Sequence, residues 1–400
     1  MKRYGPAWLV ILAGVCAALH VGKLPAALPV LRDALGVSLV QAGFLLSLVQ
    51  LAGMTLGMAV GLAADSIGLR RTMLAGLSIL AAASAAGAWA NQPWHLLVLR
   101  AAEGLGFLLV TMPAPALIRM LVDPRRLSAA LGWWSAFMPL GTALALLGGP
   151  FILQMAGWQA LWVVLAVLTA AMALLLAAAI PAKSIRGSGA PGVAGWLARV
   201  RETIGSTGPW LVALCFAVYS AQWMSVIGFL PSIYLQAGLP SGWTAVATAG
   251  AAAVNMIGNV AAGRLLQRGL SPDRLMLIGY GAMGLGAWLA FGPVAGNLPG
   301  LAGPGVRYAA VLVFSMVGGT IPGTLFSMAV RLAPNDRTVS TTVGWMQQWS
   351  SFGQFVGPPV VAWVAHAVGG WQWTWTVTGA CASIGIALTL SARHRLRTAS

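Results

Sequence analysis

Residues 61–71 read GLAADSIGLRR and form the most polar interruption in the first hundred residues of this 400-residue chain. A long apolar run precedes this stretch and another follows it. Because a membrane-spanning helix needs about 20 predominantly apolar residues, we interpret the stretch as a short hairpin between two spans. Its paired arginines favour the cytoplasmic side of the membrane.

Each polar or small residue of this hairpin has an expected role. Gly61 lets two helices approach closely, and Asp65 can cap the positive end of a neighbouring helix. Gly68 permits a turn with positive φ, while Arg70 and Arg71 hold the loop near anionic lipid. Taken singly, these residues also fit an ordinary basic loop. The interpretation as a gating loop depends on the complete spacing, G-x-x-x-D-x-x-G-x-R-R.

The composition indicates a polytopic membrane protein. The chain is 59% hydrophobic and 8% charged, whereas soluble domains have about 25% charged residues. The net charge of +16 could indicate nucleic-acid binding, but the expected topology places 19 of the 23 Lys and Arg residues on one side. The four exceptions are Lys23, Arg32, Arg100 and Arg307. This asymmetry follows the positive-inside rule, so we expect no nucleic-acid partner.

Twelve stretches are long and apolar enough to be spans. The expected spans are 7–30, 38–62, 72–91, 94–119, 127–153, 157–180, 209–235, 243–268, 273–294, 306–332, 340–366 and 371–391. The basic residues at both ends of the chain place both termini in the cytoplasm. We divide the chain into a six-helix bundle at 1–180, a cytoplasmic linker at 181–207 and a second bundle at 208–400 with a short basic tail.

The two halves repeat one another. Gly157-Trp158-Gln159 opens the sixth span, and Gly370-Trp371-Gln372 opens the twelfth. Gly148-Gly149-Pro150 and Gly357-Pro358-Pro359 lie in the fifth and eleventh spans. Internal repeats of this kind are typical of secondary transporters.

The hairpin pattern resembles the loop between helices 2 and 3 of the major facilitator superfamily. The run R-x-x-E-G-x-G at 100–106 is similar to the fourth-helix motif of that family, with glutamate in place of glutamine. The resemblance implies an all-α membrane protein with twelve transmembrane helices in two pseudo-symmetric six-helix bundles, the major facilitator fold. Stretches at 22–31, 39–43 and 353–359 are similar to the cyanate and nitroimidazole permease branch, which implies a small anionic or polar solute.

The first span carries His20 and Lys23, which are three residues apart and share a helix face. Lys23 lies about 10 Å inside the expected periplasmic end, at 1.5 Å per residue. It could snorkel outward to the headgroups. Alternatively, it lines a water-filled cavity where Pro25 and Pro29 open the helix. We include both His20 and Lys23 among the substrate-binding candidates.

The fourth span carries Arg100 and Glu103. Counted from Trp94 at the interface, Glu103 is about 14 Å deep, near the middle of a core about 30 Å thick. Of the seven acidic residues of the chain, Glu103 is the one expected deep in a span. A carboxylate there costs at least about 2.5–3.5 kcal/mol, so it forms a self-neutralising pair with Arg100 or handles substrate or protons. We predict substrate contact for both residues and proton coupling for Glu103.

The second half offers neutral polar and aromatic candidates in place of charges. The substrate-binding candidates there are Tyr219, Gln222, Asn255, Trp345 and Gln348. Polar side chains within spans also hold helices together. A Trp near the end of a span often anchors the helix at the membrane interface or packs against its neighbours. Each of these residues therefore has a structural alternative.

The sequence predicts a transporter and contains no catalytic constellation, so we expect no enzyme activity, no cofactor and no metal site. The leading hypothesis is a secondary active transporter of a small anionic or polar organic solute, working by alternating access with protons as a candidate coupling ion. The alternative is a proton-coupled exporter of hydrophobic drugs, although the fifth span keeps only fragments of the antiporter pattern G-x-x-x-G-P-x-x-G-G. We expect a monomer in the inner, or plasma, membrane, with the lipid bilayer as its surroundings.

The hairpin interpretation makes a prediction about the gate. Asp65 should lie against the start of the eleventh span in the outward-open state, so Asp65→Asn removes a charge–dipole contact worth about 0.3–2 kcal/mol. The variant should shift the protein toward inward-open and keep its affinity for substrate. Distance measurements across the cytoplasmic gate would contradict this if the populations of the two states stayed unchanged.

Overall fold

The computed structural model describes residues 5–123, 127–180, 193–293, 302–391 and 393. Within these residues the chain is helical and contains no strand. The expected all-α fold is therefore confirmed. The expected linker at 181–207 falls partly outside the described residues, and the division of the chain into two bundles stays a prediction.

The described part of the first half consists of helices and one 3₁₀ turn. These are α1 (Ala7–Leu35), α2 (Leu39–Ser47), η1 (Leu48–Gln50), α3 (Leu51–Ile67), α4 (Leu69–Gly87), α5 (Pro93–Thr111), α6 (Ala114–Leu121), α7 (Leu127–Ser135) and α8 (Phe137–Ala179). Several expected spans are thus made of two helices in line, such as α5 followed by α6. Pro113 lies at that junction, where a residue without an N–H breaks the hydrogen-bond ladder.

The second half follows the same plan. Its elements are α9 (Val193–Ile204), α10 (Thr207–Gln236), α11 (Ser241–Ala253), α12 (Asn255–Gln267), α13 (Pro272–Phe291), α14 (Ala302–Gly318), α15 (Thr320–Arg331), η5 (Asp336–Thr338), α16 (Val339–Val368), η6 (Trp371–Trp373) and α17 (Thr374–Ser391). The helix α9 lies within the expected linker at 181–207.

The described helices account for the twelve expected spans. Among the described residues, nine segments are long and apolar enough to cross a membrane. One of these, α8, has 43 residues and contains two spans, because Gly157 interrupts it with φ 78° and ψ 174°. The remaining two spans are α4 and α16, which carry more polar residues, including Arg70 and Arg71 in the first turn of α4.

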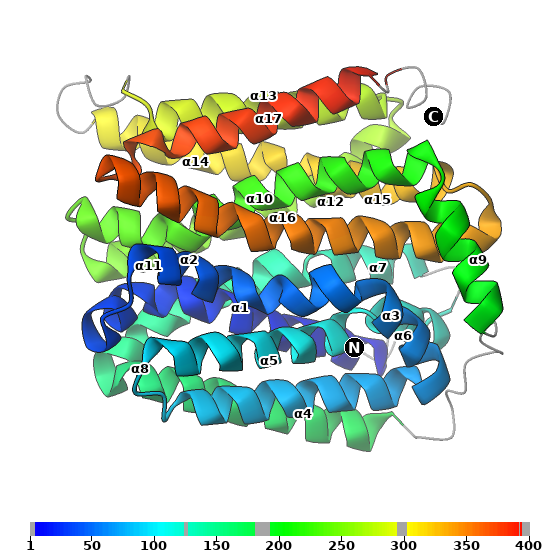
Figure 1. Ribbon diagram of the computed structural model, residues 1–400, viewed down its shortest axis with the longest axis horizontal. Helices are drawn as coiled ribbons and strands as arrows, with labels where there is room; N and C mark the ends of the chain where they lie inside the picture. Colours follow the sequence, from blue (N-terminus) through cyan, green and yellow to red (C-terminus); the bar gives the residue numbers. More distant parts are fainter. Residues whose placement is uncertain (1–4, 124–126, 181–192, 294–301, 392, 394–400) are drawn as a thin grey trace.

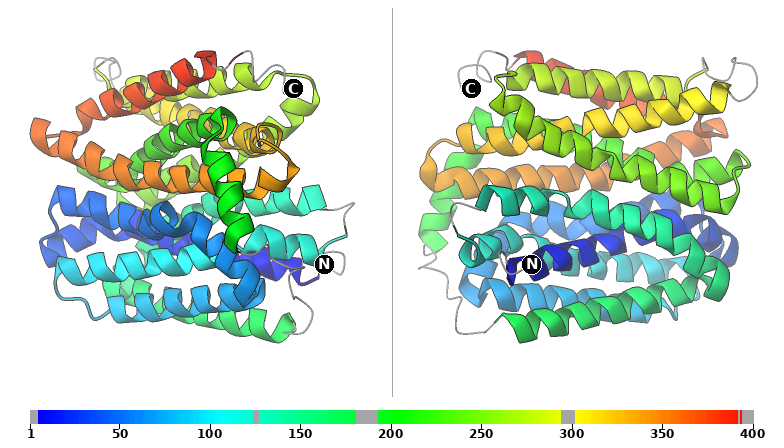
Figure 2. Two further views of the ribbon diagram at one scale, coloured as in Figure 1. Left: turned by 45° about the vertical axis from the view of Figure 1, so that its right-hand side comes forward. Right: turned by 180° about the vertical axis from the view of Figure 1, so that it is seen from behind.

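The helices run roughly parallel to one long direction, with the first half beneath the second in Figure 1. The described chain begins and ends on the same side of this bundle. We call that side the basic end, because the hairpin arginines and those after α15 and α17 lie there; the opposite side, where α1 ends at Leu35, is the far end. Figure 2 shows from two further directions that α9 lies at the basic end, outside the bundle.

The two halves meet along several helix pairs. Helices α2 and α3 lie against α16, α1 against α10, and α11 against α8. At the centre of the seam, Gln50 Nε2 donates to Gln354 Oε1 at 3.0 Å, and Ser351 Oγ donates to Gln50 Oε1 at 3.2 Å. Small residues allow this approach: a Cβ on Gly43 would come within 2.8 Å of Pro359 Cα.

The hairpin between α3 and α4 has one backbone feature that the sequence predicted, while its role as a gating loop stays a prediction. Gly68 has φ 102°, in the region that glycine adopts without strain. The side chain of Arg71 is exposed, whereas Arg70 Nη2 donates to the Ala177 carbonyl oxygen at 2.7 Å. Arg70 therefore interacts with the C-terminal turn of α8, where a cation is favoured. The side chain of Asp65 and the surroundings of Gly61 lie outside the described residues, so their roles stay predictions.

Close packing within the first half can be tested at Gly76. A Cβ on this residue of α4 would lie 2.7 Å from the Gly106 carbonyl oxygen and 2.8 Å from the Val110 nitrogen of α5. Gly76→Ala should lower the free energy of unfolding by about 1–3 kcal/mol, because backbone atoms must move apart. Thermal unfolding of the purified protein measures this.

The matched control is Gly281→Ala in α13, where nothing lies within 4 Å of the new methyl group. Alanine is the better helix former by about 1 kcal/mol, so this control should be neutral or stabilising. Equal effects of the two substitutions would contradict the tight α4–α5 contact.

Candidate functional site

Glu103 lies between two cations in the interior of the first half. Arg100 Nη1 donates to Glu103 Oε2 at 2.7 Å, and Lys23 Nζ forms an ion pair with Oε1. The side chains of all three residues are at most 2% exposed. The predicted Arg100–Glu103 pair is present, and Lys23 is the second cation.

Lys23 reaches this position from α1 and contacts two more helices. Its ammonium nitrogen donates to Ser84 Oγ of α4 at 3.0 Å and lies 3.4 Å from His20 Nδ1. It also lies 4.5 Å from the ring centroid of Trp162 of α8, within the range of a cation–π interaction. An ammonium group has three N–H donors, so Glu103, Ser84 and His20 account for all three.

Arg100 holds α5 against α1 and α2. Its Nε donates to the Leu45 carbonyl oxygen at 3.1 Å and its Nη1 to the His20 carbonyl oxygen at 2.6 Å. Its Nη2 is buried and has no hydrogen-bond partner among the described residues. The guanidinium is therefore fixed in place with one donor group to spare.

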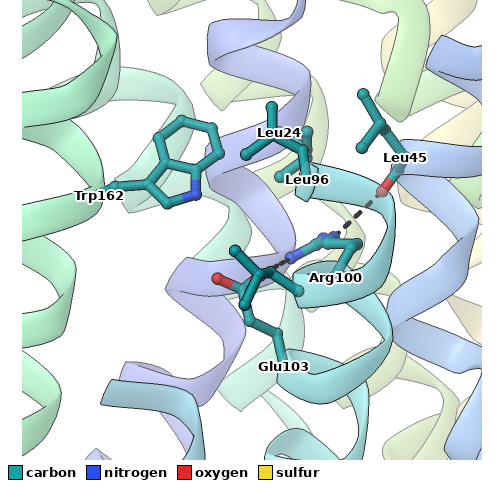
Figure 3. A pocket seen from close by; sticks show the side chains of 7 residues that line it. Leu24, Leu45, Leu96, Arg100, Glu103 and Trp162 are labelled. Carbon is teal, nitrogen blue, oxygen red and sulfur yellow. Dashed lines mark hydrogen bonds and ion pairs between the residues drawn. The ribbon is translucent and has the colours of Figure 1, made fainter. Parts of the chain in front are cut away.

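A small cavity adjoins Arg100 and Glu103 (Figure 3). Its volume is about 10 Å³, which is room for about one water molecule. Figure 3 shows the indole of Trp162 on one side and leucine side chains near the guanidinium. The lining residues are Leu24, Leu45, Leu96, Leu99, Arg100, Glu103 and Trp162.

The ion cluster of Lys23, Arg100 and Glu103 carries one positive charge in excess. Two cations face one carboxylate, and the fourth titratable group, His20, lies 3.8 Å from Glu103 Oε1. An uncompensated charge in the membrane interior is expensive. The cluster is therefore suited to binding an anion or to exchanging a proton.

The position of Lys23 corrects one expectation. Its side chain is 0% exposed, so it neither snorkels to the headgroups nor lines a water-filled cavity in this structure. Helix α1 also continues through Pro25 and Pro29 to Leu35. The expected span ended at residue 30, and the helix extends to Leu35 instead.

The second half contains a separate, neutral polar cluster. Asn255 Nδ2 donates to Tyr219 Oη at 3.0 Å and to the Ser315 carbonyl oxygen at 2.8 Å. Asn259 Nδ2 donates to Asn255 Oδ1 at 2.9 Å, and Trp223 Nε1 donates to Ser315 Oγ at 3.1 Å. These contacts join α10, α12 and α14, so they fit the structural alternative for Tyr219 and Asn255.

The remaining candidates are not brought together with either cluster. Gln222 Nε2 donates to the carbonyl of Val218 on its own helix, at 3.0 Å. Gln348 Oε1 accepts from the Met58 nitrogen at 3.4 Å, across the seam between the halves. Trp345 packs edge-on against Trp210, with the ring centroids 4.9 Å apart. Among the described residues, no group of three His, Cys, Asp or Glu side chains is placed to hold a metal ion.

Sequence reasoning missed the neutral residues that complete the ion cluster. Ser84 and Trp162 contact the ammonium of Lys23, and Thr169 contacts His20. Ser84 and Thr169 are single hydroxyl residues in the apolar stretches AAASAAG and AVLTAAM. A small polar residue within a span was the available signal, but such residues also mediate helix packing.

Comparison with known proteins decides the family. The family model of the Major Facilitator Superfamily matches residues 10–351. The chain belongs to the Major Facilitator Superfamily. It is therefore a multi-pass membrane protein of a transporter family, in agreement with the predicted fold.

Two further comparisons fit this superfamily membership. A bacterial homologue of the human lysosomal transporter Spinster, in an inward-facing and unoccupied conformation, superposes with a TM-score of 0.77 at 17% identity, over 98% of this chain and 97% of its own. The chain is 31% identical over 116 residues to the tetracenomycin C resistance and export protein of Streptomyces glaucescens, which is 28% of this chain and 22% of that protein.

A second curated relative is the multidrug resistance protein MdtH of Cronobacter sakazakii. The chain is 37% identical to it over 93 residues, which is 23% of each protein. The matches thus span about a quarter of the length of these curated relatives. The distant structural likeness supports the fold alone.

The ion cluster predicts energetic coupling between Lys23 and Glu103. Glu103→Gln leaves two buried cations without a counter-ion and should destabilise the protein by about 3–5 kcal/mol. Lys23→Met leaves a neutral Arg100–Glu103 pair and should cost less. The double variant should be more stable than the sum of the single effects implies, by about 0.5–3 kcal/mol.

Denaturant unfolding of the four proteins in the cycle measures this coupling. Lys23→Met combined with Glu202→Gln is the control, because Glu202 lies on α9 and bonds Asn335 instead. Distant sites add independently. Additive effects for Lys23 and Glu103 would show that the ion pair contributes nothing to the folded state.

Proposed function

We propose that the protein is a proton-coupled secondary transporter of a small anionic or polar organic solute. The observation that carries this proposal is the excess positive charge of the buried cluster formed by Lys23, Arg100 and Glu103. A net positive site deep in a membrane protein favours an anionic ligand. Membership of the superfamily supports transport by alternating access.

Charge balance gives the coupling a physical basis. With Lys23 protonated, the cluster has one excess positive charge, and a bound monovalent anion brings the site to zero. When the anion has left, the loss of one proton from the cluster also brings it to zero. The cluster is then neutral both with and without the anion when the protein changes between its two orientations, which avoids the cost of moving a buried charge. This scheme is a one-to-one symport of a proton with a monovalent anion.

Arg100 is the residue that would contact the solute. Its Nη2 has no partner among the described residues, and Arg100 is one of the residues that line the small cavity. A guanidinium presents a planar fork of donors that matches a carboxylate. The cavity now has room for about one water, so the solute requires a rearrangement of the helices that carry Leu24, Leu45 and Leu96.

We further propose that the protein lies in the inner membrane with its basic end in the cytoplasm. The described arginines at that end support this orientation through the positive-inside rule. Conformational change would then alternately open the basic end and the far end. This motion moves the two halves relative to each other, and the contact of α2 and α3 with α16 is part of the seam between them.

Export of a hydrophobic drug is the second candidate function. The partial likeness to proteins named for tetracenomycin C resistance and multidrug resistance favours it. It requires a wide apolar cavity between the halves and gives no role to an excess positive charge. A thermal-shift screen of the purified protein separates the two candidates, because a bound ligand stabilises the native state. Small carboxylates and inorganic anions should raise the unfolding temperature, and stabilisation by cationic drugs alone would favour export.

Proton coupling predicts a specific defect for Glu103→Gln. This variant should lose accumulation driven by a pH gradient in proteoliposomes, because the cluster can no longer be neutral in both forms. It should retain exchange of radiolabelled solute between the two sides, which needs no net proton movement. The solute is the anion that the thermal-shift screen selects.

Glu202→Gln is the matched control, since it neutralises an exposed carboxylate on α9 outside the cluster. It should accumulate solute like the unmodified protein. Full accumulation by folded Glu103→Gln would remove Glu103 from the coupling mechanism and leave it as a structural partner of Arg100.

A further inference from the structure

His20 connects the ion cluster to a line of side chains that leads along α1 toward the basic end. Lys23 Nζ lies 3.4 Å from His20 Nδ1, and His20 Nε2 lies 2.7 Å from Thr169 Oγ1 of α8. Thr169 Oγ1 in turn lies 3.4 Å from Cys16 Sγ. The four side chains thus form one continuous series of hydrogen-bond contacts.

The hydrogen bonds fix the tautomer of His20 by two independent arguments. An ammonium can only donate, so Nδ1 must offer its lone pair to Lys23. The single hydroxyl proton of Thr169 is donated to the Leu165 carbonyl at 2.7 Å, so Thr169 Oγ1 accepts from His20 Nε2–H. Both arguments require neutral His20 with its proton on Nε2, which is the tautomer that can pass a proton along the series.

We propose that Lys23 exchanges the coupling proton with the basic end through His20, Thr169 and Cys16, inside the first half of the protein. This inference rests on the proposed proton coupling and identifies the group that carries the proton and its route. Glu103 then stays ionised as the shared counter-ion of Lys23 and Arg100.

The transfer balances at every step. The Lys23 ammonium gives a proton to His20 Nδ1, and His20 gives its Nε2 proton to Thr169 Oγ1. Thr169 first turns its hydroxyl proton from the Leu165 carbonyl to Cys16 Sγ and passes it there, while Cys16 releases its own thiol proton to a water molecule that reaches it from the basic end when that end is open. Afterwards Lys23 is a neutral amine that accepts from His20 Nδ1–H, while Thr169 donates to His20 Nε2. Every donor again has an acceptor, and the cluster has lost one charge.

Charge favours Lys23 over Glu103 as the group that exchanges. Protonating Glu103 would leave two adjacent cations without a counter-ion, whereas deprotonating Lys23 leaves a neutral Arg100–Glu103 pair. The titratable groups that face Lys23 are His20 from α1 and both Arg100 and Glu103 from α5. Helices α4 and α8 contribute only groups that do not titrate, such as Ser84.

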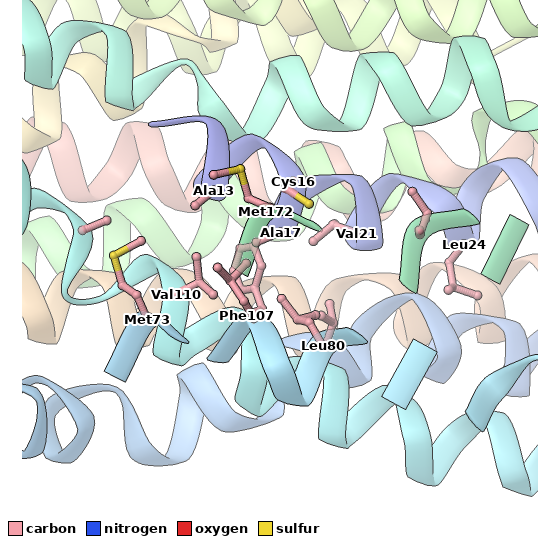
Figure 4. Packing of buried hydrophobic residues seen from close by; sticks show 14 of the residues in the cluster. Ala13, Cys16, Ala17, Val21, Leu24, Met73, Leu80, Phe107, Val110 and Met172 are labelled. Atoms are coloured by element: carbon pink, nitrogen blue, oxygen red, sulfur yellow. The ribbon is translucent and has the colours of Figure 1, made fainter. Parts of the chain in front are cut away.

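Burial supports the direction of the route. His20, Lys23 and Thr169 are 0% exposed, whereas Cys16 is 8% exposed. From Lys23 to Cys16 the series covers about 10 Å along α1, at 1.5 Å per residue. Figure 4 shows Cys16 within the apolar core of the first half, which includes Ala17 and Met172. Such walls keep water away from His20 and Thr169, so the proton passes through these side chains until it reaches Cys16.

A pH jump on the protein in nanodiscs tests the route without any solute. Stopped-flow mixing with the pH dye pyranine follows proton release, and subtracting the trace of Lys23→Met isolates the proton of Lys23. Thr169→Val removes the hydroxyl but keeps the shape, so it should slow this release about a hundredfold. Thr169→Ser restores a hydroxyl and should rescue the rate. Cys16→Ala and Cys16→Ser repeat the comparison at the next position.

The tautomer is a second readout. The ¹⁵N ring signals of His20, assigned by their loss in His20→Gln, should show a proton on Nε2 and none on Nδ1. Release from folded Thr169→Val at the unmodified rate, or a proton on Nδ1, would overturn the relay. That outcome leaves the proposed function standing, since it is tested separately by solute accumulation in Glu103→Gln.

Discussion

The packing of the first half depends on the carboxylate of Glu103, which is held between Lys23 and Arg100. These three side chains come from α1 and α5 and are at most 2% exposed. Breaking a buried ion pair by removing one partner costs several kcal/mol, because the other charge stays buried. The cluster therefore fixes how α1 and α5 pack, and Arg100 extends the constraint to α2 through the Leu45 carbonyl. The net charge of the cluster must also be neutralised before the helices move.

The rest of the fold positions this cluster by close helix packing. Gly76 and Gly106 bring the backbones of α4 and α5 together, which places Ser84 beside the ammonium of Lys23. The bend at Gly157 returns the chain through α8, so Trp162 and Thr169 reach the cluster from the other side. Small residues therefore matter here because they let four helices supply polar groups to one buried point.

Much of this arrangement could be predicted from the sequence. Helix boundaries followed from apolar runs of membrane length, and the expected 371–391 span coincides with η6 and α17. The Arg100–Glu103 pair followed from its i, i+3 spacing. The contact of Lys23 with Glu103 depends on how α1 packs on α5, so spacing along one helix could not establish it. Ser84 and Thr169 gave too weak a signal to distinguish from packing residues, and the tautomer of His20 needed the positions of both its neighbours.

The central claim is that the cluster is neutral both with and without bound anion when the protein changes between its two orientations. The most direct measurement is uptake of a radiolabelled monovalent anion, chosen by the binding screen, into proteoliposomes with the pH gradient and the membrane potential set independently. Valinomycin and potassium gradients impose the potential. Neutral coupling predicts that uptake follows the pH gradient and does not change when the potential is reversed at constant pH gradient. Uptake that follows the potential would show that a net charge crosses with the solute, and would contradict the account.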